Sequence, residues 1–369
     1  MRGRVKRAPC GPNDTLWHAF LLVATQLIAR PSEQRALSLA QSLGGRHILS
    51  TTVGRAQAAR QLAVERPDAR VVCWYLDQFQ QLLAGGEDQP GNLLLECQAD
   101  CPAGEFDLAA MPFSMHGVAE LTRDLLQSAA DRLAIGGKLV AATDNPRDQW
   151  LGEQVGRLLK KVTRHDFDNA VVYVATKRQP LKKLKDFGCE FVFRDRERLI
   201  KAVSRPGVFS HRHIDPGARR LLAAAEVQPG MRILDIGCGA GTVSLALAAR
   251  EPTASVLAVD SHTRAVECTL HGASLNGLAN VTAVLNATGE YPDAASFDLA
   301  VANPPYYADF EIAARFVAAA RRSLKPGGKL LLVTKSPRWY DEHLAADWRD
   351  VQVEPSKRYF VVSARRPSP

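Results

Sequence analysis

The chain repeats itself once, and this internal repeat limits the possible folds more than any other feature of the sequence. Two four-residue matches share an offset of 191 residues: Phe106-Asp-Leu-Ala109 with Phe297-Asp-Leu-Ala300, and Gly136-Gly-Lys-Leu139 with Gly327-Gly-Lys-Leu330. Without gaps, 11 of the 36 positions in 106–141 are identical to their counterparts in 297–332. Further upstream the offset is 183 and pairs Asp77 with Asp260. This period is too long for a solenoid, so the sequence predicts two whole domains of similar fold.

Both copies alternate short apolar runs with stretches of helical periodicity, the pattern of a mostly parallel sheet covered by helices on both faces. In the second copy we expect strands at 232–236, 255–259, 281–285, 299–302 and 329–334. We expect helices at 242–250, 263–275 and 311–324, the last one stopped by Pro326-Gly327-Gly328. A short helix after Lys335 and a closing antiparallel pair, 351–353 with 359–362, complete the predicted α/β domain.

Charge and apolar pattern divide the chain into four predicted regions. They are a basic N-terminal arm and helix (1–30), a first domain (31–176), a basic linker (177–205) and a second domain (206–369). The linker holds ten basic and four acidic residues, so its charge of +6 accounts for most of the +8 of the whole chain. Such a segment is typical of a nucleic-acid contact, and equally of a solvated surface between domains. The arm and the linker are therefore candidate RNA contacts.

The remaining composition excludes several classes of protein. No apolar run reaches the roughly 18 to 20 residues that a membrane span needs, so no membrane contact is predicted. The seven cysteines are scattered through the sequence, which favours a reducing, cytoplasmic location. None of them has a partner at zinc-ligand spacing, so no metal site is predicted.

A glycine-rich loop follows the first predicted strand of the second copy. It reads Asp235-Ile-Gly237-Cys-Gly239-Ala-Gly241 and leads into a helix. Glycines permit a tight turn and the close approach of a ligand, and the helix start offers free amide donors. The spacing D-x-G-x-G-x-G differs from the G-x-G-x-x-G of dinucleotide-binding folds, which disfavours a nicotinamide-dependent oxidoreductase. Asp260, at the end of the next strand, is placed to accept both ribose hydroxyls, or simply to cap a helix.

The motif Asn303-Pro304-Pro305-Tyr306 follows the fourth predicted strand, at the edge where open α/β sheets place their chemistry. The two prolines fix the backbone and supply no N–H donors, so carbonyl groups face the cleft. The Asn303 side-chain oxygen and the Pro304 carbonyl can each accept a hydrogen from an exocyclic amine, which turns the nitrogen lone pair toward an electrophilic methyl group. Tyr306 can stack on a planar base or amide. The structural alternative is a turn with a core tyrosine.

These motifs together resemble class I S-adenosylmethionine-dependent methyltransferases that carry the N-P-P-[YF] motif of amino-group methylases. More narrowly, the sequence is similar to the duplicated-domain bacterial rRNA guanine-N2 methyltransferases, which have a degenerate amino-terminal copy and a working carboxyl-terminal copy. The narrower resemblance is carried by the duplication, by Asn303 to Tyr306 and by the lead-in segments Pro206-Gly-Val-Phe-Ser210 and Ile214-Asp215-Pro-Gly217. It implies two tandem Rossmann-like domains, each with a mostly parallel seven-stranded sheet and an antiparallel closing strand.

The resemblance also implies a cofactor and a site. S-adenosyl-L-methionine would be bound by Asp235, Gly237, Gly239, Gly241 and Asp260, with Phe209 at its border and Asn286 facing the adenine. Asn303, Pro304, Pro305 and Tyr306 would be the catalytic residues. Family members commonly continue this motif with His and Gly, whereas Tyr307-Ala-Asp-Phe310 follows here and leaves the target base open. The segment Lys335–Tyr340 matches no family pattern, and it either lines the substrate cleft or closes the domain.

The first copy lacks both chemical motifs. The glycine loop is replaced by Ser50-Thr-Thr-Val-Gly54-Arg-Ala-Gln57, and the second motif by Pro112-Phe-Ser-Met115. We therefore expect the first domain to bind no cofactor and to act as a scaffold, an RNA-positioning surface or a folding partner.

The leading hypothesis is methyl transfer to the N2 amine of a guanine in ribosomal RNA, free or in a ribosomal particle. The target base would be flipped out or in a loop, because a stacked base is out of reach. Methylation of a protein glutamine or of DNA adenine suits the same motif. A non-catalytic RNA-binding assembly factor is the alternative from another class.

Overall fold

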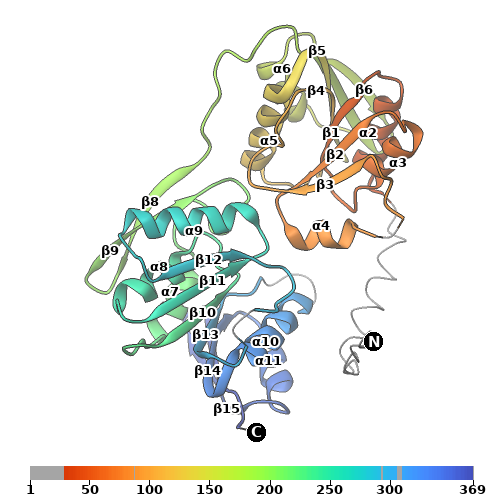
Figure 1. The fold of residues 1–369 in the computed structure, drawn as a ribbon. Helices are drawn as coiled ribbons and strands as arrows, with labels where there is room; N and C mark the ends of the chain where they lie inside the picture. Colours follow the sequence, from red (N-terminus) through yellow and green to blue (C-terminus); the bar gives the residue numbers. More distant parts are fainter. Residues whose placement is uncertain (1–28, 87, 292–293, 306–309, 369) are drawn as a thin grey trace, which may run out of the picture.

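The structure is a computed structural model that describes residues 29–86, 88–291, 294–305 and 310–368. Tyr306 and residues 1–28 of the predicted basic arm lie outside the described residues. The described chain forms two α/β domains, with the linker running along one side from the first domain to the second (Figure 1).

The first domain is built on a seven-stranded sheet with the order β3-β2-β1-β4-β5-β7-β6. Its strands are β1 (His47–Ser50), β2 (Arg70–Tyr75), β3 (Leu93–Cys97), β4 (Phe106–Phe113), β5 (Leu133–Thr143), β6 (Thr163–Phe167) and β7 (Ala170–Thr176). Its helices are α2 (Pro31–Gln41), α3 (Gln57–Glu65), α4 (Gln78–Ala84), α5 (Ala119–Arg132) and α6 (Trp150–Leu158). Strands β1 to β5 pair in parallel, whereas β7 runs antiparallel to β5 and to β6.

The second domain repeats this topology as β12-β11-β10-β13-β14-β16-β15. Its strands are β10 (Arg232–Ile236), β11 (Ser255–Asp260), β12 (Val281–Leu285), β13 (Phe297–Ala302), β14 (Leu324–Thr334), β15 (Arg349–Ser356) and β16 (Tyr359–Arg365). Its helices are α7 (Pro216–Ala224), α8 (Thr242–Arg250), α9 (Thr263–Leu275), α10 (Glu311–Ser323) and α11 (Pro337–Leu344). The identical strand order confirms the predicted pair of α/β domains with antiparallel closing strands.

Each sheet is buried on both faces, which explains why its strands are continuous apolar runs. Successive side chains of a strand point to opposite faces. Ile48 and Leu49 of β1 accordingly lie in the two separate cores of the first domain. Ile233 and Leu234 of β10 lie in the two cores of the second. The repeat therefore preserves the burial pattern of the sheets.

Strand β14 begins at Leu324, earlier than the expected start at 329. Helix α10 stops at Ser323, next to its expected end at 324, and Leu324 pairs with Phe297 as the first residue of β14. The expected stop signal therefore lies inside the β14 segment, where Gly327 takes a left-handed φ of 77°. Pairing with β13 ends the helix before the proline and glycines are reached.

The predicted linker contains more structure than expected. Strands β8 (Cys189–Asp195) and β9 (Arg198–Ser204) form an antiparallel hairpin, and Phe193 and Ile200 are buried in the core of the second domain. Lys177, counted among the basic linker residues, is buried, and its Nζ donates to two main-chain carbonyls at the end of α5, at 2.6 and 2.7 Å. The apolar residues that alternate along 189–204 pack in the core of the second domain. Of the predicted linker, residues 177–188 therefore form the irregular connection between the domains.

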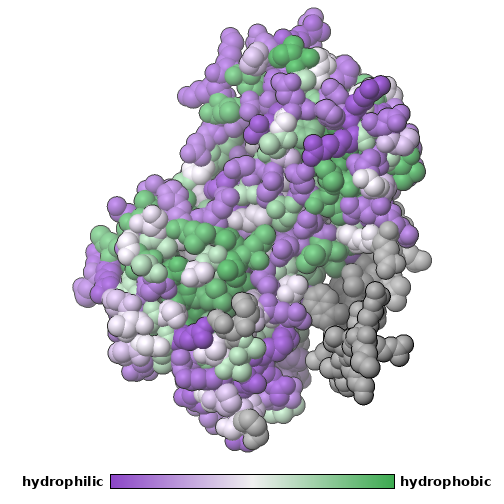
Figure 2. All heavy atoms as spheres, viewed as in Figure 1, coloured by the Kyte–Doolittle hydropathy of each residue, from purple (hydrophilic) through white to green (hydrophobic). Residues whose placement is uncertain are grey.

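No helix among the described residues is long and apolar enough to cross a membrane. Figure 2 shows a surface on which polar and apolar side chains are mixed, with an apolar area over α9, where Leu270 is exposed.

Candidate active site

The strand order brings the two predicted motifs to one edge of the second sheet. Strand β10 lies between β11 and β13, and Ile236 is paired with Val259 on one side and with Ala302 on the other. Gly237, Asp260 and Asn303 each follow directly after one of these three residues. Because all three strands are parallel, these three residues lie side by side at the carboxyl end of the sheet.

The glycine loop has a backbone that other residues would strain. Gly237, Gly239 and Gly241 all have positive φ, at 76°, 55° and 72°. At Gly239 a Cβ atom would also lie 1.8 Å from the main-chain oxygen of Phe209. That oxygen accepts a hydrogen bond from the Ala240 N–H at 2.8 Å. Glycine is thus required here, because the 209–210 segment packs directly on the loop.

The two acidic residues of the motif have different surroundings. Asp235 is buried, and its Oδ2 accepts a 2.5 Å hydrogen bond from Ser244 Oγ in α8. Asp260 is half-buried and accepts from the N–H groups of Gly239, at 2.9 Å, and His262, at 2.8 Å. Burial raises the pKa of each carboxyl to about 6. Asp235 therefore anchors α8, whereas Asp260 joins the glycine loop to the loop after β11.

Phe209 and Asn286 border the same edge. The Phe209 side chain is 62% exposed, although its carbonyl is fixed on the glycine loop. The Asn286 N–H donates to the main-chain oxygen of Asp260 at 2.9 Å. Its side chain accepts from the N–H groups of Thr288 and Gly289 and thereby shapes the turn after β12. The structure thus brings both residues next to Asp260 or the glycine loop.

Asn303 is oriented by a residue that the sequence reading used only as part of a lead-in segment. Its Nδ2 donates to Asp215 Oδ2 at 3.0 Å, and the same carboxylate oxygen accepts from the Ala218 N–H at the start of α7. Only the NH2 side of an amide can donate, so this contact leaves Asn303 Oδ1 as an acceptor. Pro304 is buried and Pro305 is half-buried beside it.

Phe310, the described residue of the segment that departs from the family pattern, contacts segment 335–340. Phe310 stacks on Trp339 of α11 with ring centroids 4.9 Å apart and planes 5° apart, and Tyr340 meets Phe310 edge-on at 6.3 Å. Tyr340 is buried in the core. Segment 335–340 therefore closes the domain through Tyr340 and packs on Phe310 through Trp339.

The first domain contacts the loop after β11 at the edge of the candidate site in the second. Asp77 and His262 form an antiparallel bridge, with hydrogen bonds of 2.8 Å from Gln78 N to Ser261 O and from Thr263 N to Leu76 O. Asp77 Oδ2 also accepts from Ser261 Oγ at 3.0 Å. Asp77 is the repeat counterpart of Asp260, so the loop after β2 in the first domain contacts the corresponding loop after β11 in the second.

A buried arginine strengthens this contact. Arg264 is 1% exposed, and its guanidinium donates to the carbonyls of Ala99 and Pro206 at 2.8 and 2.9 Å. It also lies 2.6 Å from the carboxylate of Asp124 in α5. Four residues earlier in α5, Glu120 lies 2.6 Å from Arg212 and 2.9 Å from His211, close to the 209–210 segment.

Sequence reasoning did not single out three residues that make contacts around the candidate site, namely Asp215, Asp77 and Arg264. Asp215 precedes a Pro-Gly helix start, which signals a cap but not a contact with Asn303. The repeat identified Asp77 as the counterpart of Asp260, but it did not predict that the two domains are in contact there. Arg264 had no sequence signal, because an arginine in a helix is ordinarily exposed.

In the first domain the corresponding helix start is already satisfied by the chain itself. Glu33 of α2 is fully buried, and its carboxylate accepts from Thr52 Oγ1 and from the Ala58 N–H, both at 3.1 Å or less. Burial raises the pKa of this carboxyl. Ala56 holds a left-handed backbone in the loop before α3. Among the described residues of both domains, no group of three or more metal-ligating side chains could hold a metal ion.

Comparisons with known proteins agree with this architecture. The model of the methyltransferase small domain family matches residues 200–364. The ribosomal RNA small subunit methyltransferase C of Pseudomonas fluorescens is 30% identical over 302 residues, which cover 78% of this chain and 87% of that protein. The protein of the same name from Pseudomonas aeruginosa is 29% identical over 312 residues, covering 81% of this chain and 91% of that one.

A solved structure has the same fold over both domains. It is the 16S rRNA N2 methyltransferase of T. thermophilus in complex with AdoMet and guanosine, with a TM-score of 0.73 and 23% identity. The match covers 90% of this chain and 92% of that one. With a relative of 30% identity matched over most of its length, the chain belongs to the ribosomal RNA small subunit methyltransferase C family.

Proposed function

We propose that this protein transfers a methyl group from S-adenosylmethionine to the N2 amine of a guanine in small-subunit ribosomal RNA. One observation carries the proposal: Asn303, with its amide oxygen left as an acceptor, stands beside a glycine loop and Asp260 at the carboxyl ends of three adjacent parallel strands. The names of the relatives support ribosomal RNA as the substrate.

The residues at the glycine loop fit the cofactor. Three left-handed glycines give the tight turn at the start of α8, where a Cβ would clash with neighbouring protein atoms. The Asp260 carboxylate has lone pairs beyond the two backbone N–H groups from which it accepts. We assign the ribose hydroxyls to Asp260, the amino-acid end to the loop 237–241, and the borders of the cofactor to Phe209 and Asn286. Asp235 acts through α8. When bound, S-adenosylmethionine supplies an electrophilic methyl group.

The chain itself positions the amine. Asn303 Oδ1 and the Pro304 carbonyl each accept one N–H hydrogen, which directs the nitrogen lone pair toward the cofactor side of the cleft. Pro305 fixes the backbone, and Tyr306 provides a stacking face. Most of the rate acceleration comes from this positioning, and the amine proton passes to solvent. Asp215 is a positioning residue, because it acts through Asn303.

The proposed division of labour follows the contacts. Residues 206–369, together with the hairpin 189–204, form the catalytic domain, and 31–176 form a degenerate domain that supports its cofactor loops. The exposed basic residues of 177–188 and the N-terminal arm are RNA contacts in this proposal. Methylation of a protein glutamine or of DNA adenine would use the same Asn303 geometry, but the relatives' names support neither.

Transfer of a tritiated methyl group tests the proposal. The substrates are total RNA and ribosomal particles from a strain lacking the gene, followed by digestion to nucleosides. We expect label in N2-methylguanosine of small-subunit rRNA. Label in protein glutamine or in DNA N6-methyladenine would overturn the proposed substrate, and cofactor binding with no transfer to any of the three would favour a non-catalytic assembly factor.

A further inference from the structure

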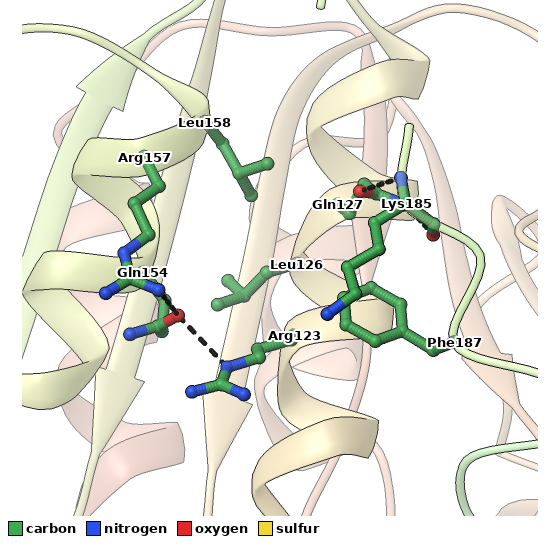
Figure 3. A pocket seen from close by; sticks show the side chains of 8 residues that line it. All are labelled: Arg123, Leu126, Gln127, Gln154, Arg157, Leu158, Lys185 and Phe187. Atoms are coloured by element: carbon green, nitrogen blue, oxygen red, sulfur yellow. Dashed lines mark hydrogen bonds between the residues drawn. The ribbon is translucent and has the colours of Figure 1, made fainter. Parts of the chain in front are cut away.

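A basic hollow of about 190 Å3 lies on the first domain, between helices α5 and α6 and the linker (Figure 3). Three cationic side chains from three different segments line it: Arg123 of α5, Arg157 of α6 and Lys185 of the linker. None of the described residues that line the hollow is acidic. Figure 3 shows the Lys185 side chain passing over the Phe187 ring and the Arg123 guanidinium near Gln154.

These cations are held by neutral partners. Arg123 Nε donates to Gln154 Oε1 at 3.1 Å, and Arg157 shares that oxygen at 3.5 Å. Lys185 Nζ lies 5.1 Å from the centre of the Phe187 ring. Neutral partners orient the cations without neutralising them, so mutual repulsion favours binding of an anion. Three acidic residues adjoin lining residues in the sequence, and none of them lines the hollow: Glu153 and Asp186 are exposed, and Asp124 is paired with Arg264.

The hollow also has a fixed apolar floor. Leu126 is fully buried and Phe187 is 6% exposed, with Leu158 beside them. Gln127 holds the linker against α5, because its amide donates to the Lys185 carbonyl at 2.9 Å and accepts from the Lys185 N–H at 2.8 Å. The cations therefore surround a preformed apolar surface.

We propose that this hollow binds a nucleotide of the substrate RNA, with its backbone phosphate on Arg123, Arg157 and Lys185 and its base or sugar against the apolar floor. The inference rests on the proposed function only in taking RNA as the substrate. Arginine forks match phosphate geometry, and an apolar floor next to cations matches the alternation of base and phosphate along a strand. The exposed Lys182 and Lys183 extend the basic track, which suits a polyanion.

Arg123→Gln/Arg157→Gln in the full chain tests the site. Binding to protein-free small-subunit rRNA is measured between about 50 and 200 mM salt. We expect the dissociation constant to rise about tenfold and the slope of log K against log salt to shrink by about 0.7, as for the loss of one phosphate contact to single-stranded RNA. Affinity for S-adenosylmethionine stays unchanged. Arg157→Glu, at an exposed position with one long hydrogen bond, serves as a second variant should the double variant fold poorly.

The matched control is Arg147→Gln/Lys160→Gln, which removes two exposed charges from the same domain outside the hollow. Equal weakening by the control, or no weakening by the hollow variants, would overturn the site. Displacement of RNA by poly-glutamate from the wild type but not from the variant would assign the hollow to an acidic peptide instead. Methyl transfer to the same RNA by the wild type is measured in parallel, and its absence contradicts the proposed function without affecting the affinity comparison.

Discussion

The two copies of the repeat share one strand order but satisfy the same helix start in different ways. In the second domain three left-handed glycines precede α8, and Asp235 is bonded within the domain to Ser244. In the first, Glu33 reaches from α2 to the start of α3 and occupies its donors with a carboxylate of the chain itself. A helix start can hold an external ligand only where no internal anion has taken its place.

The first domain also makes contacts with loops near the candidate site of the second domain. The first domain contributes Asp77 and Asp124 to contacts with the loops that surround the candidate site in the second. The copy without the chemical motifs has thus kept its fold and its edge loop, and that loop is now part of an interface. The two copies differ at the glycine and Asn-Pro-Pro positions, whereas they share their strand order and their burial pattern.

Arg264→Met should have the largest effect, because it removes a buried contact that holds the two domains together. It leaves the Asp124 carboxylate without its buried partner, which costs about 3–5 kcal/mol. We expect the melting temperature to fall by roughly 6–20 °C. Calorimetry would then show separate transitions for the two domains. The double variant Arg264→Met/Asp124→Leu should recover part of the loss, and a shift within about 2 °C would contradict the anchoring role.

Asn303→Ala tests whether chemistry belongs to one copy alone. Removing the amide acceptor should lower kcat by about 10² to 10³-fold, or roughly 2.7–4 kcal/mol, because the amine is no longer oriented. Cofactor affinity, measured by calorimetry, should stay within about twofold. The comparison change in the first copy is Ser114→Ala, at a polar residue of the segment that replaces the motif, and it should leave kcat unchanged. If cofactor binding were lost together with methyl transfer, Asn303 would not be the residue that orients the amine.

Gly239→Ala and Gly54→Ala compare the two loops directly. In the second copy the new Cβ meets the Phe209 carbonyl, so we expect cofactor affinity to fall by about 10- to 100-fold. In the first copy the new Cβ meets only the flexible Gln57 side chain, so affinity should be unaffected. Equal effects of the two changes, measured by equilibrium binding, would contradict the assignment of the cofactor to the second loop.

Asp77→Asn produces the smallest expected change and probes the contact between counterpart loops. Burial, and to a lesser degree the charge of Asp77, raises the pKa of Asp260 to about 6. The ionised carboxylate is the better acceptor for ribose hydroxyls, so affinity for S-adenosylmethionine should be lost as the pH falls below about 6. Asparagine still caps α4 but removes the like charge, so the midpoint should move to lower pH. An unchanged midpoint in a pH titration of binding would show that Asp77 does not influence Asp260.

The fold could be read from the sequence because its signals are local or repeated. The alternation of apolar runs with helical segments predicted a mostly parallel sheet, and the internal repeat predicted that there are two such sheets. The start of β14 at Leu324 and the hairpin at 189–204 were not foreseen, because pairing of Leu324 with Phe297 and burial of Phe193 depend on distant partners. The Asn303 motif and glycine loop were identified by type and spacing, whereas the orientation of the Asn303 amide depends on Asp215, 88 residues away.

By itself, the sequence determined the two domains, the loss of the chemical motifs in the first and the side chains available for methyl transfer in the second. These properties depend on which residue types stand close together in the sequence, because such local patterns decide where strands and turns form and which acceptor groups follow them. Only the tertiary structure decided that Glu33 fills the first helix start, that Asp77 pairs with the loop after Asp260, and that Arg264 is buried between the copies. Such contacts join residues far apart in the chain, and their energies depend on burial and distance, which no local pattern records.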